Sequence, residues 1–156
     1  MEYISKSVKE THKIAKTILL DLIKSHEDMA LVIILKGELG AGKTEFVKGL
    51  KEVFKIKENI LSPTFVLMKV YNIVNPRFKK IYHFDLYRLK EGEMEENQII
   101  SALETLNIYD VLNDSENIVL IEWGEGISLF NKIKAKNIEI KQGGDGIRNF
   151  KIDFFV

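Results

Sequence analysis

The chain has 156 residues, enough for one domain with a proper hydrophobic core. Its 23 basic and 23 acidic residues cancel, so no global charge draws it onto nucleic acid. The absence of cysteine excludes disulfides and cysteine-ligated metal sites, and no apolar stretch is long enough to span a membrane, so we expect a single cytoplasmic domain over residues 1–156.

The first 28 residues predict a short strand followed by an amphipathic helix. Residues 2–5 are the candidate strand. Ser7 and Glu10 have the spacing of a capping box, which marks the start of a helix. Apolar residues then recur at helical spacing as far as Ile23, before the polar run at residues 25–28 ends the pattern.

A phosphate-binding loop is predicted at residues 37–44, whose sequence GELGAGKT matches G-x-x-x-x-G-K-[ST]. A β-branched apolar run at 30–35 precedes it and predicts a buried strand. Residues 45–54 follow with helical spacing of apolar residues. A strand, a glycine-rich loop and a helix form the context that this motif needs. A merely tight strand-to-helix turn is the disfavoured alternative.

The chemistry expected of this loop is nucleotide binding. Its glycines let backbone N–H groups face phosphate oxygens, and the N-terminus of the following helix adds partial positive charge. We expect Lys43 to reach the β- and γ-phosphates and the Thr44 hydroxyl to ligate Mg²⁺. The predicted nucleotide-binding residues are Gly37, Leu39, Gly40, Ala41, Gly42, Lys43 and Thr44.

The rest of the chain adds strands and one long helical segment. Residues 65–73 and 80–84 predict a hairpin, and residues 91–106 a helix with a further turn at 109–112. Residues 118–121 predict a second buried strand, and 137–141 with 147–155 an antiparallel hairpin on the edge of the sheet. We therefore expect an α/β, P-loop NTPase-like three-layer fold with a mostly parallel central sheet and antiparallel hairpin additions.

Three residues outside the loop are candidates for the hydrolytic machinery. Glu122 ends a strand, where α/β sheets bind ligands, and is predicted to serve the metal rather than to be an ordinary surface acid. Asp85 also ends a strand. It either orients the attacking water, or it has a structural role as a helix N-cap or as an ion-pair partner of Arg88. Thr64 lies in a loop that either senses the γ-phosphate or is only a rigid turn.

The nucleotide is expected to be ATP. GTPases read guanine with an Asn-Lys-x-Asp stretch, and here the nearest equivalent, residues 131–134, ends in lysine. We predict an adenine pocket around residues 7–11. Arg148 either reaches the nucleotide or pairs with an acid.

With these residues in place, the sequence resembles the TsaE family of small bacterial P-loop ATPases. Its signatures occur in order as GELGAGKT at 37–44, SPTF at 62–65, YHFDLYRL at 82–89 and LIEW at 120–123. The resemblance implies weak ATP hydrolysis with Mg²⁺ and a role in threonylcarbamoyl modification of adenosine 37 in tRNA. It also implies partnership with the TsaB and TsaD proteins, and it leaves direct contact with tRNA open.

The resemblance also implies roles for individual residues. Lys43 and Thr44 bind phosphate and magnesium, Glu122 serves the metal, Asp85 is essential for hydrolysis, and Thr64 belongs to a switch-like loop. Trp123 occupies a position tied to function in the family, through partner contact or packing near the nucleotide, and a core aromatic is the equal alternative.

The chain departs from the family pattern in a few places. Glu38 replaces the usual aspartate, and the segment at 90–107 is longer and lacks a typical proline. Glu45 replaces a threonine or serine. A carboxylate suits the first turn of a helix but repels phosphate if it turns inward. We therefore expect Glu45 to point outward, or the nucleotide to bind less tightly.

Two other functions compete with an ATPase subunit of a tRNA-modifying complex. A nucleotide-gated binding module would use ATP to change a docking surface, with hydrolysis incidental. A small-molecule kinase would need a lid carrying arginines and an acceptor pocket. The chain has three arginines and no evident lid, which disfavours the kinase.

Overall fold

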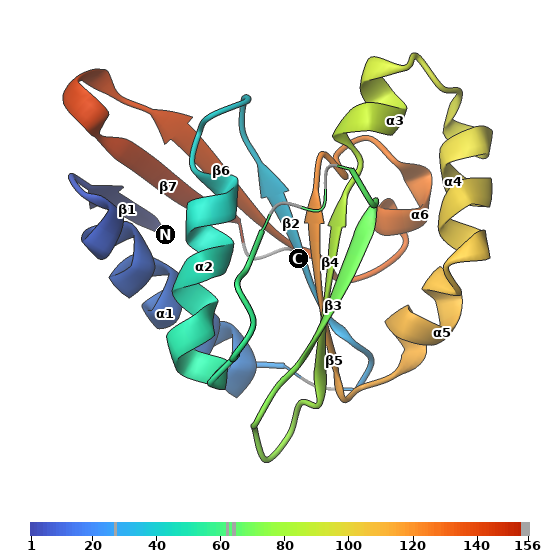
Figure 1. The fold of residues 1–156 in the computed structure, drawn as a ribbon, viewed down its shortest axis with the longest axis horizontal. Coiled ribbons are helices and arrows are strands. Elements are labelled where there is room, and N and C mark those ends of the chain that lie inside the picture. Colours follow the sequence, from blue (N-terminus) through green and yellow to red (C-terminus); the bar gives the residue numbers. More distant parts are fainter. Residues whose placement is uncertain (27, 62, 64, 154–156) are drawn as a thin grey trace.

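The computed structural model describes residues 1–26, 28–61, 63 and 65–153. Within these residues, seven strands form one sheet in the order β1-β7-β6-β2-β5-β4-β3, with helices on both faces (Figure 1). The strands are β1 Glu2–Ser5, β2 Leu31–Lys36, β3 Met68–Asn72, β4 Lys80–Asp85, β5 Asn117–Glu122, β6 Lys136–Gln142 and β7 Arg148–Asp153. The helices are α1 Val8–Lys24, α2 Lys43–Phe54, α3 Tyr87–Glu91, α4 Glu96–Thr105, α5 Ile108–Asn113 and α6 Ser128–Asn131.

The centre of the sheet is parallel and its two sides are antiparallel. β2 pairs in parallel with β5 and with β6, and β5 pairs in parallel with β4. β3 runs antiparallel to β4, and β7 runs antiparallel to both β6 and β1. The predicted three-layer α/β fold, with a mostly parallel core and antiparallel hairpin additions, is confirmed.

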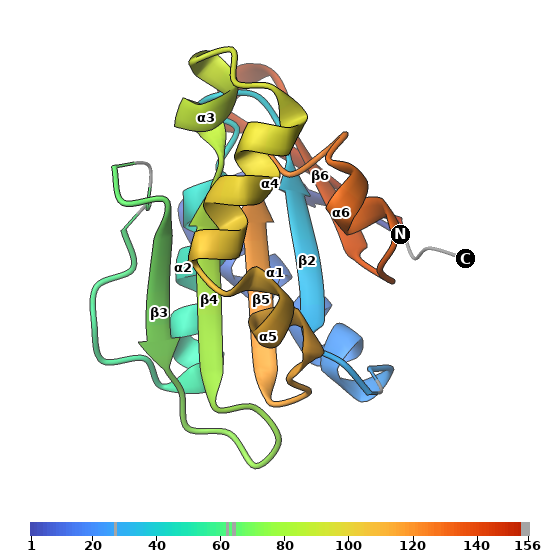
Figure 2. The same ribbon diagram turned by 90° about the vertical axis from the view of Figure 1, so that its right-hand side faces the viewer.

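The central strands bury both of their faces, which explains why they read as continuous apolar runs. Alternate residues of β5 enter different cores: Leu120 packs on the side of α1 and α2, whereas Val119 packs on the side of α4, α5 and α6. Figure 2 looks onto the second of these helix layers. Helices on both faces therefore leave the strand ends as the places where polar side chains can gather.

The predicted helix start at Ser7 is confirmed, with one change. The Ser7 hydroxyl accepts a hydrogen bond from the Glu10 amide at 3.2 Å, as an N-cap should. The Glu10 carboxylate, however, accepts from the amide of Lys6 rather than from that of Ser7, at 2.6 Å. The reciprocal half of the capping box is thus displaced by one residue toward β1.

Two other boundaries differ from the prediction. The expected single helix over 91–106 is interrupted, because Gly92 ends α3 and Glu93 adopts a positive φ of 53° before α4 begins. A capping box between Glu95 and Gln98 starts the new helix. The C-terminal hairpin forms as predicted but is not the edge of the sheet, because β1 pairs with β7 outside it.

Helices α1 and α2 approach each other closely at Gly49. A Cβ placed on this glycine would lie 2.8 Å from the Cβ of Ala15 and 2.8 Å from the Cα of His12. The backbone of α1 therefore occupies the space that a side chain would need. Among the helices that the structure describes, none is long and apolar enough to cross a membrane.

Replacing Gly49 by Ala is expected to destabilise the protein, although alanine favours helices by about 1 kcal/mol. Overpacking against a backbone costs about 1–3 kcal/mol and exceeds that gain. The free energy of unfolding, measured in urea, should fall for Gly49→Ala. Gly144→Ala is the matched control, since no atom lies within 4 Å of its new Cβ. An increase in stability for Gly49→Ala would contradict the close packing.

Candidate functional site

Three parallel strands end at the same level, and this places the candidate residues. Leu35 of β2 lies opposite Glu122 of β5, which in turn lies opposite Asp85 of β4. The side chains of Glu122 and Asp85 share the face of the sheet that α2 covers, because they continue the alternation of Leu120 and Ile81. Both acids therefore lie on the side where the glycine-rich loop leads into α2.

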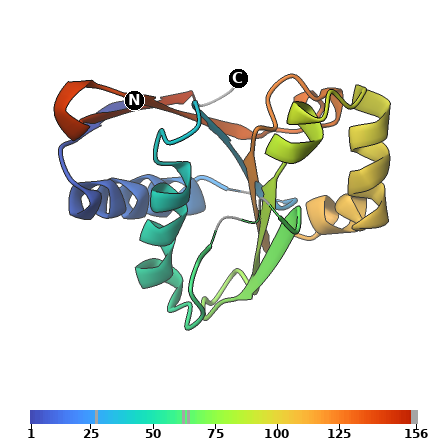
Figure 3. The same cartoon turned by 45° about the horizontal axis from the view of Figure 1, so that its top comes forward.

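The loop between β2 and α2 runs beside the β6–β7 hairpin (Figure 3). A Cβ on Gly37 would lie 2.4 Å from the backbone oxygen of Ile140, and its φ of 150° suits glycine alone. Gly42 precedes α2 with a φ of 107°, and no side chain caps the helix. The first amides of α2 are therefore not satisfied by a side-chain cap, in contrast to those of α1.

Lys43 is almost fully buried, with 5% of its surface exposed. Its Nζ donates hydrogen bonds to the backbone oxygens of Gly37 at 2.7 Å and Glu38 at 2.9 Å. Burial lowers the pKa of the Lys43 ammonium, and the carboxylates of Glu122, Asp85 and Glu125 oppose this shift. The Lys43 ammonium is thus bound by two carbonyl groups of the loop and interacts electrostatically with the carboxylates of Asp85 and Glu122.

Asp85 and Glu122 are also buried, at 3% exposure each. The Oδ1 of Asp85 accepts a hydrogen bond from the Tyr87 amide at 3.0 Å, at the start of α3. The N-cap of α3 is Leu86, so Asp85 is not the helix N-cap that the sequence offered as an alternative, although its carboxylate binds the first helical amide. Arg88, the other proposed partner, stacks on the ring of Phe65 at 4.6 Å from its centroid.

His83 is a site residue that the sequence reasoning did not single out. Its Nε2 lies 2.8 Å from the Oε1 of Glu122, and the histidine is completely buried. Its Nδ1 has no hydrogen-bond partner among the described residues. The available signal was a polar residue inside an apolar strand, two positions before Asp85 and hence on the same face. His83 therefore fixes the orientation of one oxygen of Glu122.

Trp123 covers the buried lysine. The Nζ of Lys43 lies 4.3 Å from the centroid of the Trp123 ring, which also packs at 5.2 Å from the ring of Tyr87. The ring reaches this place because the Trp123 backbone has a positive φ of 62°, immediately after Glu122 ends β5. The family-linked tryptophan thus packs at the loop, where its π face stabilises the ammonium.

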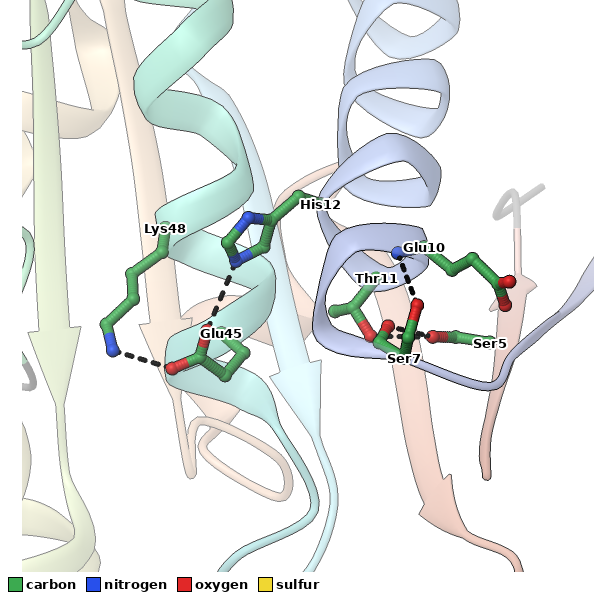
Figure 4. Close-up of polar contacts among 7 residues, drawn as sticks. All are labelled: Ser5, Ser7, Glu10, Thr11, His12, Glu45 and Lys48. Atoms are coloured by element: carbon green, nitrogen blue, oxygen red, sulfur yellow. Dashed lines mark hydrogen bonds and ion pairs between the residues drawn. The ribbon is translucent and has the colours of Figure 1, made fainter. Parts of the chain in front are cut away.

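Glu45 points away from the loop, as one of the two expectations stated. Its carboxylate lies between Lys48, at 2.6 Å, and the Nε2 of His12 on α1, at 3.1 Å (Figure 4). The hydrogen bond from Lys48 is the main cause of a lowered Glu45 pKa, and that from His12 adds to it against partial burial. Glu45 therefore ties α2 to α1.

The other predicted residues occupy different surroundings. Thr44 is half-buried as the second residue of α2, and Leu39 is 73% exposed. Ala41 packs its methyl group in the core, so it can serve a nucleotide only through its backbone. Thr64, the predicted switch residue, lies outside the described residues, as does Ser62.

The N-terminus of α1, predicted to border an adenine pocket, has its hydroxyl groups engaged. Ser5 donates to the backbone oxygen of Ser7 at 2.8 Å, so Thr11, whose hydroxyl lies 2.8 Å from that of Ser5, must be the donor of that second bond. Figure 4 shows this pair at the start of the helix. The adenine pocket stays a prediction.

The residues present suit a magnesium ion that is shared with a nucleotide. Among the described residues, no cluster of three His, Asp, Glu or Cys side chains could hold a metal alone. Mg²⁺ in nucleotide sites is typically held by one or two protein side chains, several waters and the substrate phosphates. Two buried carboxylates beside the loop, with Lys43 as their nearby cation, match such a shared ion.

Comparison with known proteins shows the family of this chain. The family described as "Threonylcarbamoyl adenosine biosynthesis protein TsaE" matches residues 5–150. The chain belongs to the TsaE family. The predicted family resemblance is therefore confirmed over nearly the whole chain.

Relatives in the TsaE family are similar over much of this chain. A Haemophilus influenzae "tRNA threonylcarbamoyladenosine biosynthesis protein TsaE" is 41% identical over 104 residues, 67% of this chain and 58% of that protein. A TsaE of the same description from Mycobacterium tuberculosis is 32% identical over 110 residues, 70% of this chain and 62% of that protein. The match thus spans less than two thirds of the length of these relatives.

A solved structure supports the TsaE-type fold. The crystal structure of Bacillus subtilis YdiB is 26% identical and superimposes with a TM-score of 0.66, covering 97% of this chain and 83% of that one. The shared fold therefore includes the antiparallel additions on both sides of the parallel core.

Nucleotide binding is expected to change the fluorescence of Trp123, the single tryptophan of the chain. A bound phosphate would draw the Lys43 ammonium away from the loop carbonyls and so alter the surroundings of the ring. Emission should change saturably with added ADP, with a midpoint equal to the Kd from calorimetry. The Trp123→Phe variant should bind ADP without the signal. Calorimetric binding with constant emission from the unaltered protein would contradict the prediction.

Replacing Glu45 by Thr is expected to change the affinity for ATP by less than about threefold, because the carboxylate faces Lys48 and His12. Stability should fall by less than about 1 kcal/mol, as for other partly exposed ion pairs. The lowered pKa means that this contribution is present above the ordinary carboxyl pKa and is lost as the pH falls through the folded-state value.

Calorimetry with ATP and urea unfolding from pH 3 to pH 7 measure the two effects. Glu45→Gln, which removes the charge and keeps the shape, is the control. An ATP affinity that rises tenfold in Glu45→Thr would show that the carboxylate repels the nucleotide.

Proposed function

We propose that this protein is an ATP hydrolase that uses Mg²⁺ and acts in threonylcarbamoyl modification of tRNA. The observation that carries the hydrolase is the burial of Lys43, Asp85 and Glu122 around one glycine-rich loop. Charged side chains are seldom fully buried without a reason, and such clusters mark functional sites. An ordinary strand-to-helix turn would not need them.

Each residue has a role in the proposed reaction. The loop amides and Lys43 bind the phosphates, and Thr44 and Glu122 hold the magnesium ion, which neutralises charge on the β- and γ-phosphates when bound. Asp85 orients a water molecule and accepts its proton. The water oxygen bonds to the γ-phosphorus while the bond to the β,γ-bridging oxygen breaks, and ADP and inorganic phosphate leave. Thr64 is proposed to sense the γ-phosphate.

The biological role is proposed from the family. The relatives from Haemophilus and Mycobacterium are named as tRNA threonylcarbamoyladenosine biosynthesis proteins. We place this chain in the same process, in the cytoplasm, where it would work with TsaB and TsaD on adenosine 37 of tRNA. ATP hydrolysis would then sustain repeated turnover of the TsaB–TsaD complex.

The test is multiple-turnover formation of threonylcarbamoyladenosine on tRNA by TsaB and TsaD, with the activated threonylcarbamoyl substrate and ATP supplied. We expect product to stop near one equivalent without this chain and to continue with it. Asp85→Asn, which keeps an oxygen for the Tyr87 amide, should bind ATP within about threefold of the unaltered protein. It should hydrolyse ATP about 10²–10⁴-fold more slowly, the usual loss for a missing general base.

The same variant separates an ATPase from a nucleotide-gated binding module. Under the proposed function, Asp85→Asn binds ATP but does not support turnover. If it supports turnover as well as the unaltered protein does, hydrolysis is incidental and the module is the correct function. If the unaltered protein hydrolyses ATP but leaves product formation unchanged, the ATP site stands and the tRNA role is wrong.

A further inference from the structure

A row of three side chains crosses the antiparallel side of the sheet next to the glycine-rich loop. Arg148 of β7 lies opposite Ser5 of β1 and opposite Gln142 of β6, so the three side chains share one face. Gln142 reaches the loop, because its Nε2 donates to the backbone oxygen of Gly40 at 2.9 Å. The hairpin therefore contacts the loop through side chains as well as through the backbone of Ile140.

Arg148 lies against the last glycine of the loop. A Cβ placed on Gly42 would be 3.6 Å from the Nε and 3.8 Å from the Cδ of Arg148. The guanidinium therefore stands beside the residue from which α2 begins. Half-buried, it is placed within the fold rather than projecting freely into solvent.

Among the described residues, Arg148 uses little of its hydrogen-bonding capacity. Its Nη1 donates to the backbone oxygen of Ile147 at 3.0 Å, and a guanidinium carries five N–H groups. In the part of the chain that the structure describes, no carboxylate lies within ion-pair distance of Arg148. Of the two sequence-based alternatives for this residue, pairing with an acid is thus not found among the described residues.

Three acidic side chains of the candidate site do not pair with Arg148. Glu45, in the first turn of α2, is held by Lys48 and His12. Glu122 and Asp85 belong to β5 and β4, on the opposite side of β2 from β6 and β7. Among the described residues, then, no acid neutralises Arg148, and its charge can serve an anionic ligand at Gly42. The neighbouring α2 amides, which lack a side-chain cap, also favour an anion.

We propose that Arg148 is a phosphate-binding residue, which donates hydrogen bonds to the α- and β-phosphates of the bound nucleotide. This inference rests on the proposed function, in which the loop binds ATP. The backbone amides of such a loop cradle the α- and β-phosphates, and Arg148 adjoins those amides at Gly42. A planar guanidinium is suited to two-pronged binding of phosphate oxygens. ADP therefore contains every group that Arg148 contacts.

The test compares ADP, ATP and inorganic pyrophosphate as probes, by calorimetry on the full chain. Arg148→Ala should weaken binding of all three by about 10–100-fold, the usual effect of a lost charge-assisted contact. Arg148→Lys should bind the probes more tightly than Arg148→Ala but less tightly than the unaltered protein, because lysine keeps the positive charge and cannot form two parallel hydrogen bonds to a phosphate. Binding of ADP to Arg148→Ala should also depend less steeply on salt concentration, because one cationic contact is missing.

Arg77→Ala is the matched control. Arg77 precedes β4, at the end of the sheet away from the loop, where it stacks on Phe78 at 5.4 Å from the ring centroid. Removing this arginine changes the net charge equally and should leave the affinity for ADP within about twofold of the unaltered value. Thermal unfolding of each variant checks that it is folded. If Arg148→Ala does not fold, the affinities for the three probes are measured on Arg148→Lys instead.

The outcomes separate this inference from the function on which it rests. If the unaltered protein binds ADP and Arg148→Ala binds it equally well, the inference is overturned and the ATP site stands. If Arg148→Ala loses affinity for ADP but not for pyrophosphate, the guanidinium contacts the adenosine part instead, which also overturns it. If the unaltered protein binds none of the three probes, the proposed function itself fails.

Discussion

The alignment of β2, β5 and β4 is the constraint on which the candidate site depends. Leu35, Glu122 and Asp85 lie side by side because three parallel strands pair in one register. Side chains alternate between the faces of a strand, so a slip of β5 by one residue would move Glu122 to the side of α4. The apolar residues that pack between the two helix layers hold this register. The hydrophobic core thereby positions the acids, and their burial follows from it.

The distribution of charge divides the surroundings of the loop into two halves. Acidic side chains approach from β4 and β5, with Lys43 between them and the loop carbonyls. A cation and an amide approach from the hairpin of β6 and β7, through Arg148 and Gln142. A phosphate chain laid along the loop would meet these donors on one side and the carboxylates of Asp85 and Glu122 on the other. The hairpin therefore adjoins the candidate site, beyond its role in extending the sheet.

Most of the fold and the centre of the site follow from local patterns. The glycine-rich loop, the two buried strands and the strand-end positions of Asp85 and Glu122 are each visible in short stretches of sequence. Contacts between distant segments are not visible in that way. The pairing of His83 with Glu122 spans 39 positions, and β1 covers β7 from the other end of the chain. The break at Gly92 was missed because residues 91–98 are mostly polar, so no apolar spacing shows where the helix that contains Ile99 begins.

The backbone of Trp123 shows what the placement of one ring requires. A positive φ at a residue other than glycine is a strained conformation, which costs about 1–3 kcal/mol. Glycine would adopt it freely, yet glycine has no ring to lie over Lys43. Backbone strain alone therefore favours glycine at position 123, whereas the contact with the Lys43 ammonium requires the aromatic ring. A redesign that relieved this backbone strain by placing glycine here would remove the aromatic ring that lies over the buried ammonium.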